Sequence, residues 1–180
     1  MARLPYVDTD RTPQTRRVAD EVRANRGGAI PNLYHTQLHS PPVCEGWLRL
    51  GTALRHESAL DARLRELVTC LVAAQTGSEY EWAHHSDLAR RAGVTDAQLA
   101  ALTGDVDWSP FDAAQRACLQ LARCVVSNET VPDALFARVR AGLGNRAVVE
   151  LVAVASYYSG VARFLTALAV DIEADLRDDA

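Results

Sequence analysis

Two carboxylates and one imidazole between positions 66 and 85 give this chain its clearest capacity for chemistry. Glu81 and His85 are four residues apart in a helical stretch, so their side chains share one face and can hydrogen-bond. Glu66 lies on the preceding helical stretch, and the short turn at Thr76-Gly77 predicts that the two helices pack roughly antiparallel around all three side chains. Burying such groups is costly unless they pair or share protons, and this environment is typical of acid–base catalysts. A buried network with a purely structural role is the alternative interpretation.

Other side chains suggest a pocket near these three residues. Tyr158 could present its hydroxyl to a substrate, and Arg163 could bind a substrate carboxylate or pair with a surface acid. Cys70 lies on the first of the two helices and could approach the same pocket. A cysteine with no evident resolving partner is more simply interpreted as a small buried hydrophobic residue.

The histidines do not predict a metal centre. His35 and His39 have the spacing of metal ligands on a short helix, but no third ligand lies nearby in the sequence. Glu81 and His84 match the Glu-x-x-His pattern of di-iron bundles, which need a second copy that this sequence lacks. We therefore expect no metal and no cofactor, and we expect His84 to contact a neighbouring helix or subunit.

The composition fits one soluble domain over residues 1–180, with 48% hydrophobic and 23% charged residues and a net charge of −4. Arginines alternate with acids, so no basic stripe predicts nucleic-acid binding. The four cysteines include no Cys-x-x-Cys pair and predict no disulfide framework. The N-terminus lacks an apolar signal core, and apolar runs such as Leu151–Ala155 are shorter than a membrane span. We expect a cytoplasmic protein with no nucleic-acid or membrane partner.

Helix-start and helix-stop signals recur along the chain, whereas strand signals are nearly absent, which predicts an all-α fold. The last helical stretch, from Asn145 to about Leu176, is expected to divide into two helices near Ser159-Gly160. The other expected helices cover residues 13–26, a short segment after 30, 43–55, 61–76, 78–93, 95–102, 110–126 and 132–141.

The spacing of the central residues resembles the signature of the carboxymuconolactone decarboxylase and alkylhydroperoxidase D family. That signature reads Glu, eleven residues, Cys-x-x-Cys, three residues, His. Here Glu66 is followed at the same spacing by Ser78, Glu81 and His85, so both cysteine positions are changed. The string YEWAHH at 80–85 is similar to the YEWxxH form of decarboxylase-like members, and NLYH at 32–35 and YYSG at 157–160 resemble flanking elements. The likeness covers about residues 31–170 and implies an alkylhydroperoxidase D-like helical bundle.

The resemblance also implies a function, which is a cofactor-independent lyase acting on a small organic acid or lactone. In this interpretation His85 is the general acid, Glu81 its orienting partner and Glu66 a second proton relay. The side chains expected to bind the substrate are Ser78, His39, Tyr158 and Arg163. Thiol peroxidase activity is not expected, because it needs two cysteines within disulfide reach.

Three alternatives stay open at this point. One is a related isomerase or ring-opening enzyme in the same pocket, one a non-catalytic oligomeric binding or stress protein, and one a residual alkylhydroperoxidase-like peroxidase. Many decarboxylases have a proline after Tyr-x-Gly, where this chain has Val161, which leaves the substrate open. The resemblance implies a homo-oligomer, a trimer or dimer of trimers, and the apolar segment Val148–Val170 is expected to be partly buried between subunits.

Overall fold

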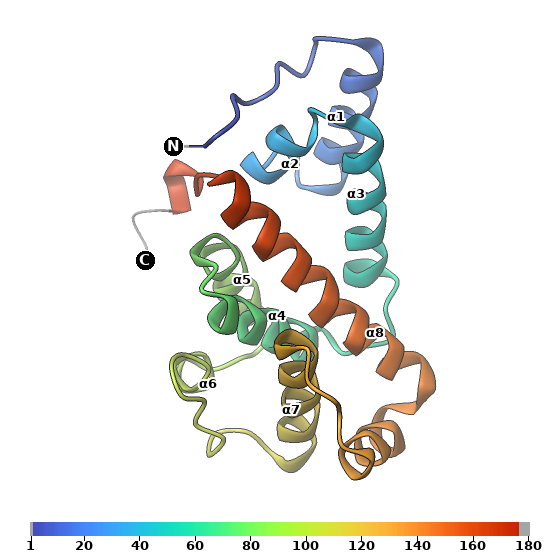
Figure 1. Ribbon diagram of the computed structural model, residues 1–180, viewed down its shortest axis with the longest axis vertical. Coiled ribbons are helices and arrows are strands. Elements are labelled where there is room, and N and C mark those ends of the chain that lie inside the picture. Colours follow the sequence, from blue (N-terminus) through green and yellow to red (C-terminus); the bar gives the residue numbers. More distant parts are fainter. Residues whose placement is uncertain (1, 177–180) are drawn as a thin grey trace. The chain divides into compact units, whose positions relative to one another are not determined.

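A computed structural model describes residues 2–176 of the chain, and this part is 70% helical with no strand (Figure 1). The expected all-α fold class is therefore confirmed. The described residues form two compact units, the first within Met1–Glu57 and Leu165–Ala180 and the second Ser58–Phe164. The helices are α1 (Pro13–Asn25), α2 (Asn32–Gln37), α3 (Pro41–His56), α4 (Ala62–Thr76), α5 (Glu79–Arg91), α6 (Asp96–Ala101), α7 (Ala113–Ser127), α8 (Asp133–Leu168) and the short 3-10 helix η1 (Ala174–Leu176).

In the first unit, α3 packs against both α1 and α2. The beginning and the end of the described chain lie side by side there, because the Arg3 N–H donates to the Leu168 carbonyl at 2.9 Å. Asp171 accepts from the Ala2 N–H at 2.9 Å, and the Asn32 amide donates to the backbone carbonyl of Asp171, also at 2.9 Å. These contacts hold α2 and both chain ends in one unit.

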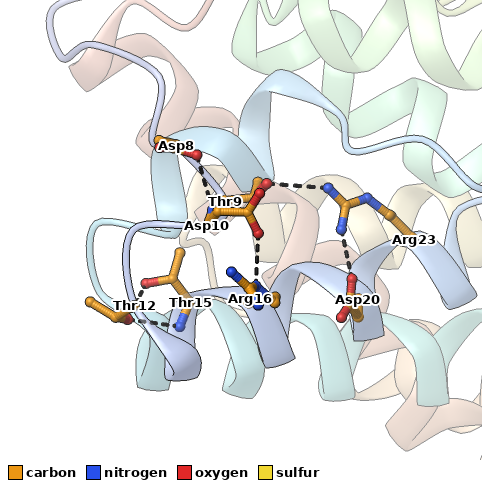
Figure 2. A network of polar contacts seen from close by, with 8 residues as sticks. All are labelled: Asp8, Thr9, Asp10, Thr12, Thr15, Arg16, Asp20 and Arg23. Carbon is orange, nitrogen blue, oxygen red and sulfur yellow. Dashed lines mark hydrogen bonds and ion pairs between the residues drawn. The ribbon is translucent and has the colours of Figure 1, made fainter.

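Polar contacts fix the start of α1, and Figure 2 shows them. Thr12 is the N-cap residue, and its hydroxyl accepts from the Thr15 N–H at 3.0 Å. Arg16 donates to Asp10 at 2.8 Å, and Arg23 donates to the Thr9 hydroxyl at 3.2 Å, so the loop before the helix is tied to the helix surface. Pro13 occupies the first turn, where its missing N–H costs no hydrogen bond. The expected start of this helix is confirmed.

In the second unit, α4 packs against both α5 and α7. Asp61 caps α4 by accepting from the Leu64 N–H at 3.2 Å. The helix ends at Gly77, whose φ of 64° lies in the left-handed region that favours glycine. The Ser78 N–H donates to the Ala73 carbonyl at 2.9 Å and the Gly77 N–H to the Ala74 carbonyl at 3.3 Å. This is the hydrogen-bond pattern of a Schellman motif, which turns the chain directly into α5.

Buried side chains of α4, α7 and α8 contribute to the core of the second unit. The fully buried leucines of these three helices are Leu67, Leu71, Leu119, Leu121 and Leu151. Truncating one such side chain to alanine typically costs about 2–5 kcal/mol of folding free energy, because the lost contacts leave a cavity. The framework that holds α4 in place is therefore apolar packing.

Three expected helix boundaries were wrong. The last helix was expected to reach about Leu176, but it ends at Leu168 and residues 174–176 form a separate 3-10 turn. The helix α7 begins at Ala113, not at Pro110, because Asp112 and Gln115 form a capping box that sets the first turn. The last helix does not divide near Ser159-Gly160, because α8 is continuous there. The Ser159 hydroxyl donates to the Ala155 carbonyl one turn earlier at 2.7 Å, which satisfies the hydroxyl within the helix. The non-helical residue within α8 is Gly144, with φ 76° and ψ 167°.

The helix α8 is long and apolar enough to meet the length and composition criteria for a membrane span. Half of its most apolar window (50%) is buried inside the protein, as in a core helix of a soluble protein, so this is weak evidence for a membrane helix. The prediction from uninterrupted apolar runs in the sequence did not include this apolar part of α8.

Candidate functional site

The centre of the site is a hydrogen bond between α4 and α5. His85 Nδ1 lies 2.8 Å from Glu66 Oε2, and the two side chains are only 6% and 5% exposed. With Glu66 ionised, Nδ1–H is the donor and the carboxylate accepts, which fixes the imidazole ring in one orientation. The Schellman turn at Gly77 makes this contact possible, because it returns α5 along α4.

Glu81 approaches the other ring nitrogen of the same imidazole. His85 Nε2 lies 3.6 Å from Glu81 Oε2, one helical turn away on α5. This distance is that of an ion pair when the imidazole is charged, and it is longer than a hydrogen bond. The imidazole therefore has a carboxylate near each nitrogen, one in hydrogen-bond contact and one slightly farther away.

Arg65 adds a positive charge that the sequence analysis did not assign to the site. Its Nε lies 3.3 Å from Glu66 Oε1, and its side chain is 14% exposed. Adjacent residues on a helix normally point about 100° apart. The arginine side chain therefore bends along the helix toward its neighbour. The only signal in the sequence was the Arg-Glu dipeptide itself, which is common on helix surfaces.

An aromatic side chain from α8 covers the imidazole. The Tyr158 ring meets the His85 ring edge-on, with centroids 4.8 Å apart and an interplanar angle of 78°. The Tyr157 ring in turn lies 5.2 Å from the Tyr158 ring. Tyr158 is itself buried. The surroundings of His85 therefore come from three helices, with Glu66 on α4, Glu81 on α5 and Tyr158 on α8.

Ser78 occupies the N-cap position of α5. Its hydroxyl accepts from the Glu81 N–H at 3.4 Å, and the residue is buried. This contact places Ser78 beside Glu81, as the spacing predicted, and gives the serine a structural role in starting the helix.

Cys70 is one turn beyond Glu66 on α4 and fully buried. Burial raises the pKa of the Cys70 thiol to about 12, and the charges of Glu66 and Glu81 contribute in the same direction. The thiol is therefore protonated at neutral pH, which favours its interpretation as a small buried hydrophobic residue.

The remaining predicted residues have the following surroundings. His39 belongs to the first unit, where it is exposed and its Nε2 lies 2.8 Å from the Pro5 carbonyl. Arg163 is exposed on α8. His84 is half-buried, and its ring stacks on Tyr80 with centroids 4.6 Å apart. Substrate binding by His39, Tyr158, Arg163 and Ser78 stays a prediction.

Within residues 2–176 there is no group of three or more His, Cys, Asp or Glu side chains arranged to hold a metal ion. The site as described consists of two carboxylates, an imidazole, a guanidinium and aromatic rings. What this set can do chemically is hold, orient and move protons.

Residues 41–123 match the model of the Carboxymuconolactone decarboxylase family. This segment of the chain is therefore similar to the carboxymuconolactone decarboxylase family, in agreement with the resemblance of the central residues. The matched segment contains Glu66, Glu81 and His85, so the predicted central residues lie within it. No protein of curated function matches this sequence.

Solved structures show the same fold as this chain. An uncharacterized peroxidase-related protein from Silicibacter sp. TM1040 is 20% identical, with a TM-score of 0.80 over 97% of this chain and 93% of its own. The alkylhydroperoxidase AhpD core protein from Ralstonia eutropha JMP134 is 20% identical, with a TM-score of 0.79 over 97% and 94% of the two chains. A Cys-to-Ala variant of the debrominase Bmp8, in complex with 2,3,4-tribromopyrrole, is 21% identical, with a TM-score of 0.76 over 96% and 92%. The expected alkylhydroperoxidase D-like fold is confirmed.

Proposed function

We propose that this protein is a cofactor-independent lyase that removes carbon dioxide from a small organic acid or lactone by acid–base chemistry. The observation that carries the proposal is the buried imidazole of His85, flanked by Glu66 at 2.8 Å and Glu81 at 3.6 Å. The family match over residues 41–123 supports the same class of chemistry.

The distances support a division of roles among the three side chains. The spacing in the sequence favoured Glu81 for the orienting role, but the shorter contact belongs to Glu66. We therefore assign Glu66 as the residue that orients the imidazole through Nδ1. Nε2 then becomes the atom that exchanges a proton with the substrate, with Glu81 beside it as the relay.

Decarboxylation without a cofactor needs a carbonyl beta or vinylogous to the leaving carboxylate. The bond between the carboxylate and its carbon breaks, and its electron pair moves through the carbonyl to give an enolate. The His85 imidazolium donates its Nε2 proton to the enolate carbon, which completes the product, and the imidazole regains a proton from solvent or Glu81. Tyr158, edge-on to the same ring, excludes water from one side of the imidazole.

The alternatives receive different support from the site. An isomerase or a ring-opening enzyme would use the same proton donor and acceptor, so the geometry fits these reactions as well. A residual peroxidase or another thiol-dependent reaction is poorly supported, because the motif positions of the cysteines hold Ser78 and Glu81 and the pKa of the Cys70 thiol is raised to about 12. A non-catalytic binding protein predicts tight binding without turnover.

The test is a substrate screen with purified protein. Carboxymuconolactone and a set of β-keto and vinylogous lactone acids would be followed by carbon dioxide release and by NMR of the products. Saturable release that disappears in His85→Ala supports the lyase. Products formed without carbon dioxide release would assign the isomerase or ring-opening reaction, and binding without any conversion would contradict an enzymatic role.

A further inference from the structure

We infer that Arg65 is a positioning residue, which keeps Glu66 ionised and aimed at His85 and lowers the tendency of the imidazole to retain its proton. The inference deepens the proposed function and rests on it for its catalytic meaning. The contacts that carry it are structural, however, and can be tested without a substrate.

Arg65 differs from the other arginines in ion pairs of the second unit. Its side chain is 14% exposed, whereas Arg90 is 50% exposed and Arg146 is 71% exposed. Exposed ion pairs are screened by water and contribute little. A guanidinium held against a carboxylate that is itself 5% exposed acts at lower dielectric and has a larger electrostatic effect.

The two oxygens of Glu66 have separate partners. Oε1 lies 3.3 Å from the Arg65 Nε, and Oε2 lies 2.8 Å from the His85 Nδ1. Because each oxygen is held, the plane of the carboxylate is fixed, and Oε2 stays in line with the imidazole.

The charges around His85 show why a cation is needed. Glu66 and Glu81 both favour the imidazolium, and two carboxylates beside one buried imidazole would hold its proton too firmly for donation. Arg65 offsets one of these negative charges. The ring of Tyr158 packs on the imidazole, and the Cys70 thiol, whose pKa burial raises to about 12, carries no charge at pH 7. Arg90 on α5 acts electrostatically on the same thiol.

The test is an NMR titration of the His85 ring in the full-length protein, compared with variants of Arg65. In Arg65→Gln the cation is lost, so the imidazolium is favoured, and the midpoint of the His85 titration should rise by about one pH unit. Arg65→Lys keeps the charge and should restore a midpoint close to that of the wild type.

The matched control is Arg63→Gln on the same helix. Arg63 donates to the neutral side chain of Gln98 at 3.0 Å, so its replacement removes the same charge two residues away without touching Glu66. Its His85 titration should stay close to that of the wild type. An unchanged midpoint in Arg65→Gln, or equal shifts in both variants, would overturn the inference.

A measurement on the wild type covers the case in which Arg65→Gln does not fold. At pH values above the midpoint of the His85 titration, the imidazole is neutral. The nitrogen-15 chemical shifts of its ring should then show the tautomer that carries the proton on Nδ1 and donates it to Glu66. A proton on Nε2 instead would mean that Glu66 is not aimed as inferred, and the role of Arg65 would be lost with it. Both readouts are independent of turnover, so a failed substrate screen would affect the proposed function without affecting this inference.

Discussion

The Oε2 atom of Glu66 and the Nδ1 atom of His85 lie 2.8 Å apart, across the contact between α4 and α5. Nineteen positions of sequence separate the two residues, and the turn at Gly77 brings them together. The pair is buried, so its hydrogen bond is protected from competition with water. The proposed chemistry depends on this contact and on the helix framework that holds it.

Removing either partner should abolish most of the activity on an identified substrate. His85→Ala removes the proton donor, and Glu66→Gln leaves an isostere that cannot stabilise the imidazolium. Losing a positioned acid or its partner typically lowers turnover by about a hundred- to ten-thousand-fold. Initial rates would be measured for each variant, and circular dichroism would check that the variant is folded. Arg163→Gln tests separately whether this exposed arginine binds the carboxylate of the substrate. A folded His85→Ala protein with nearly full turnover would move the proton donor to another residue.

Peroxide reduction that depends on thiols should be absent at neutral pH. With the pKa of Cys70 raised to about 12 by burial, only about one molecule in 100,000 carries the thiolate at pH 7. Hydroperoxide consumption with a dithiol donor would be measured for the wild type and for Cys70→Ala. We expect both to equal the background without protein. Strong turnover that Cys70→Ala removes would show that the thiol is reactive after all.

Glu150 should make the stability of the second unit depend on pH. Partial burial raises the pKa of its carboxyl, but hydrogen bonds from Arg146, from the Ser58 hydroxyl at 2.9 Å and from the Ala59 N–H at 2.8 Å outweigh this, and the pKa lies below its ordinary value. A lowered folded pKa contributes stability above the unfolded pKa, and this contribution is lost as the pH falls through the folded value.

Urea unfolding of Glu150→Gln and the wild type checks this pH dependence. At pH 7 the variant should be less stable, and the difference in free energy of unfolding should shrink as the pH falls below about 4. Glu129→Gln, at an exposed position just after α7, is the control and should show little difference at any pH. A difference for Glu150→Gln that grows toward low pH would contradict the sign of the shift.

We further propose that the protein is a homo-oligomer, a trimer or a dimer of trimers, with part of α8 between subunits. Val149 is 67% exposed on this helix, which is unusual for a valine in an apolar segment. Light scattering at micromolar concentration should give a particle mass that is a multiple of the chain mass of 19.6 kDa. Val149→Glu should lower this particle mass. A monomeric wild type would contradict the proposal. Val43→Glu serves as a control, since Val43 is an exposed valine on α3.

The sequence by itself determined the features that depend on neighbours along the chain. The caps at Thr12, Asp61 and Thr95 set helix starts through hydrogen bonds that reach only three residues, so they could be read from residue types. The four-residue spacing of Glu81 and His85 likewise places both on one face of α5, because residues one helical turn apart are neighbours on the helix surface.

Only the tertiary structure decided which carboxylate contacts the imidazole directly. Glu66 lies at 2.8 Å and Glu81 at 3.6 Å, and this order depends on how α4 packs against α5, which no local rule fixes. The contact of Arg65 with Glu66 and the packing of the Tyr158 ring on His85 have the same origin, because a side-chain conformation in a buried contact is selected by the atoms around it. The continuity of α8 through Ser159-Gly160 could not be predicted from residue types either, since helix propensity is a weak signal that tertiary context routinely overrides, and Ser159 is buried.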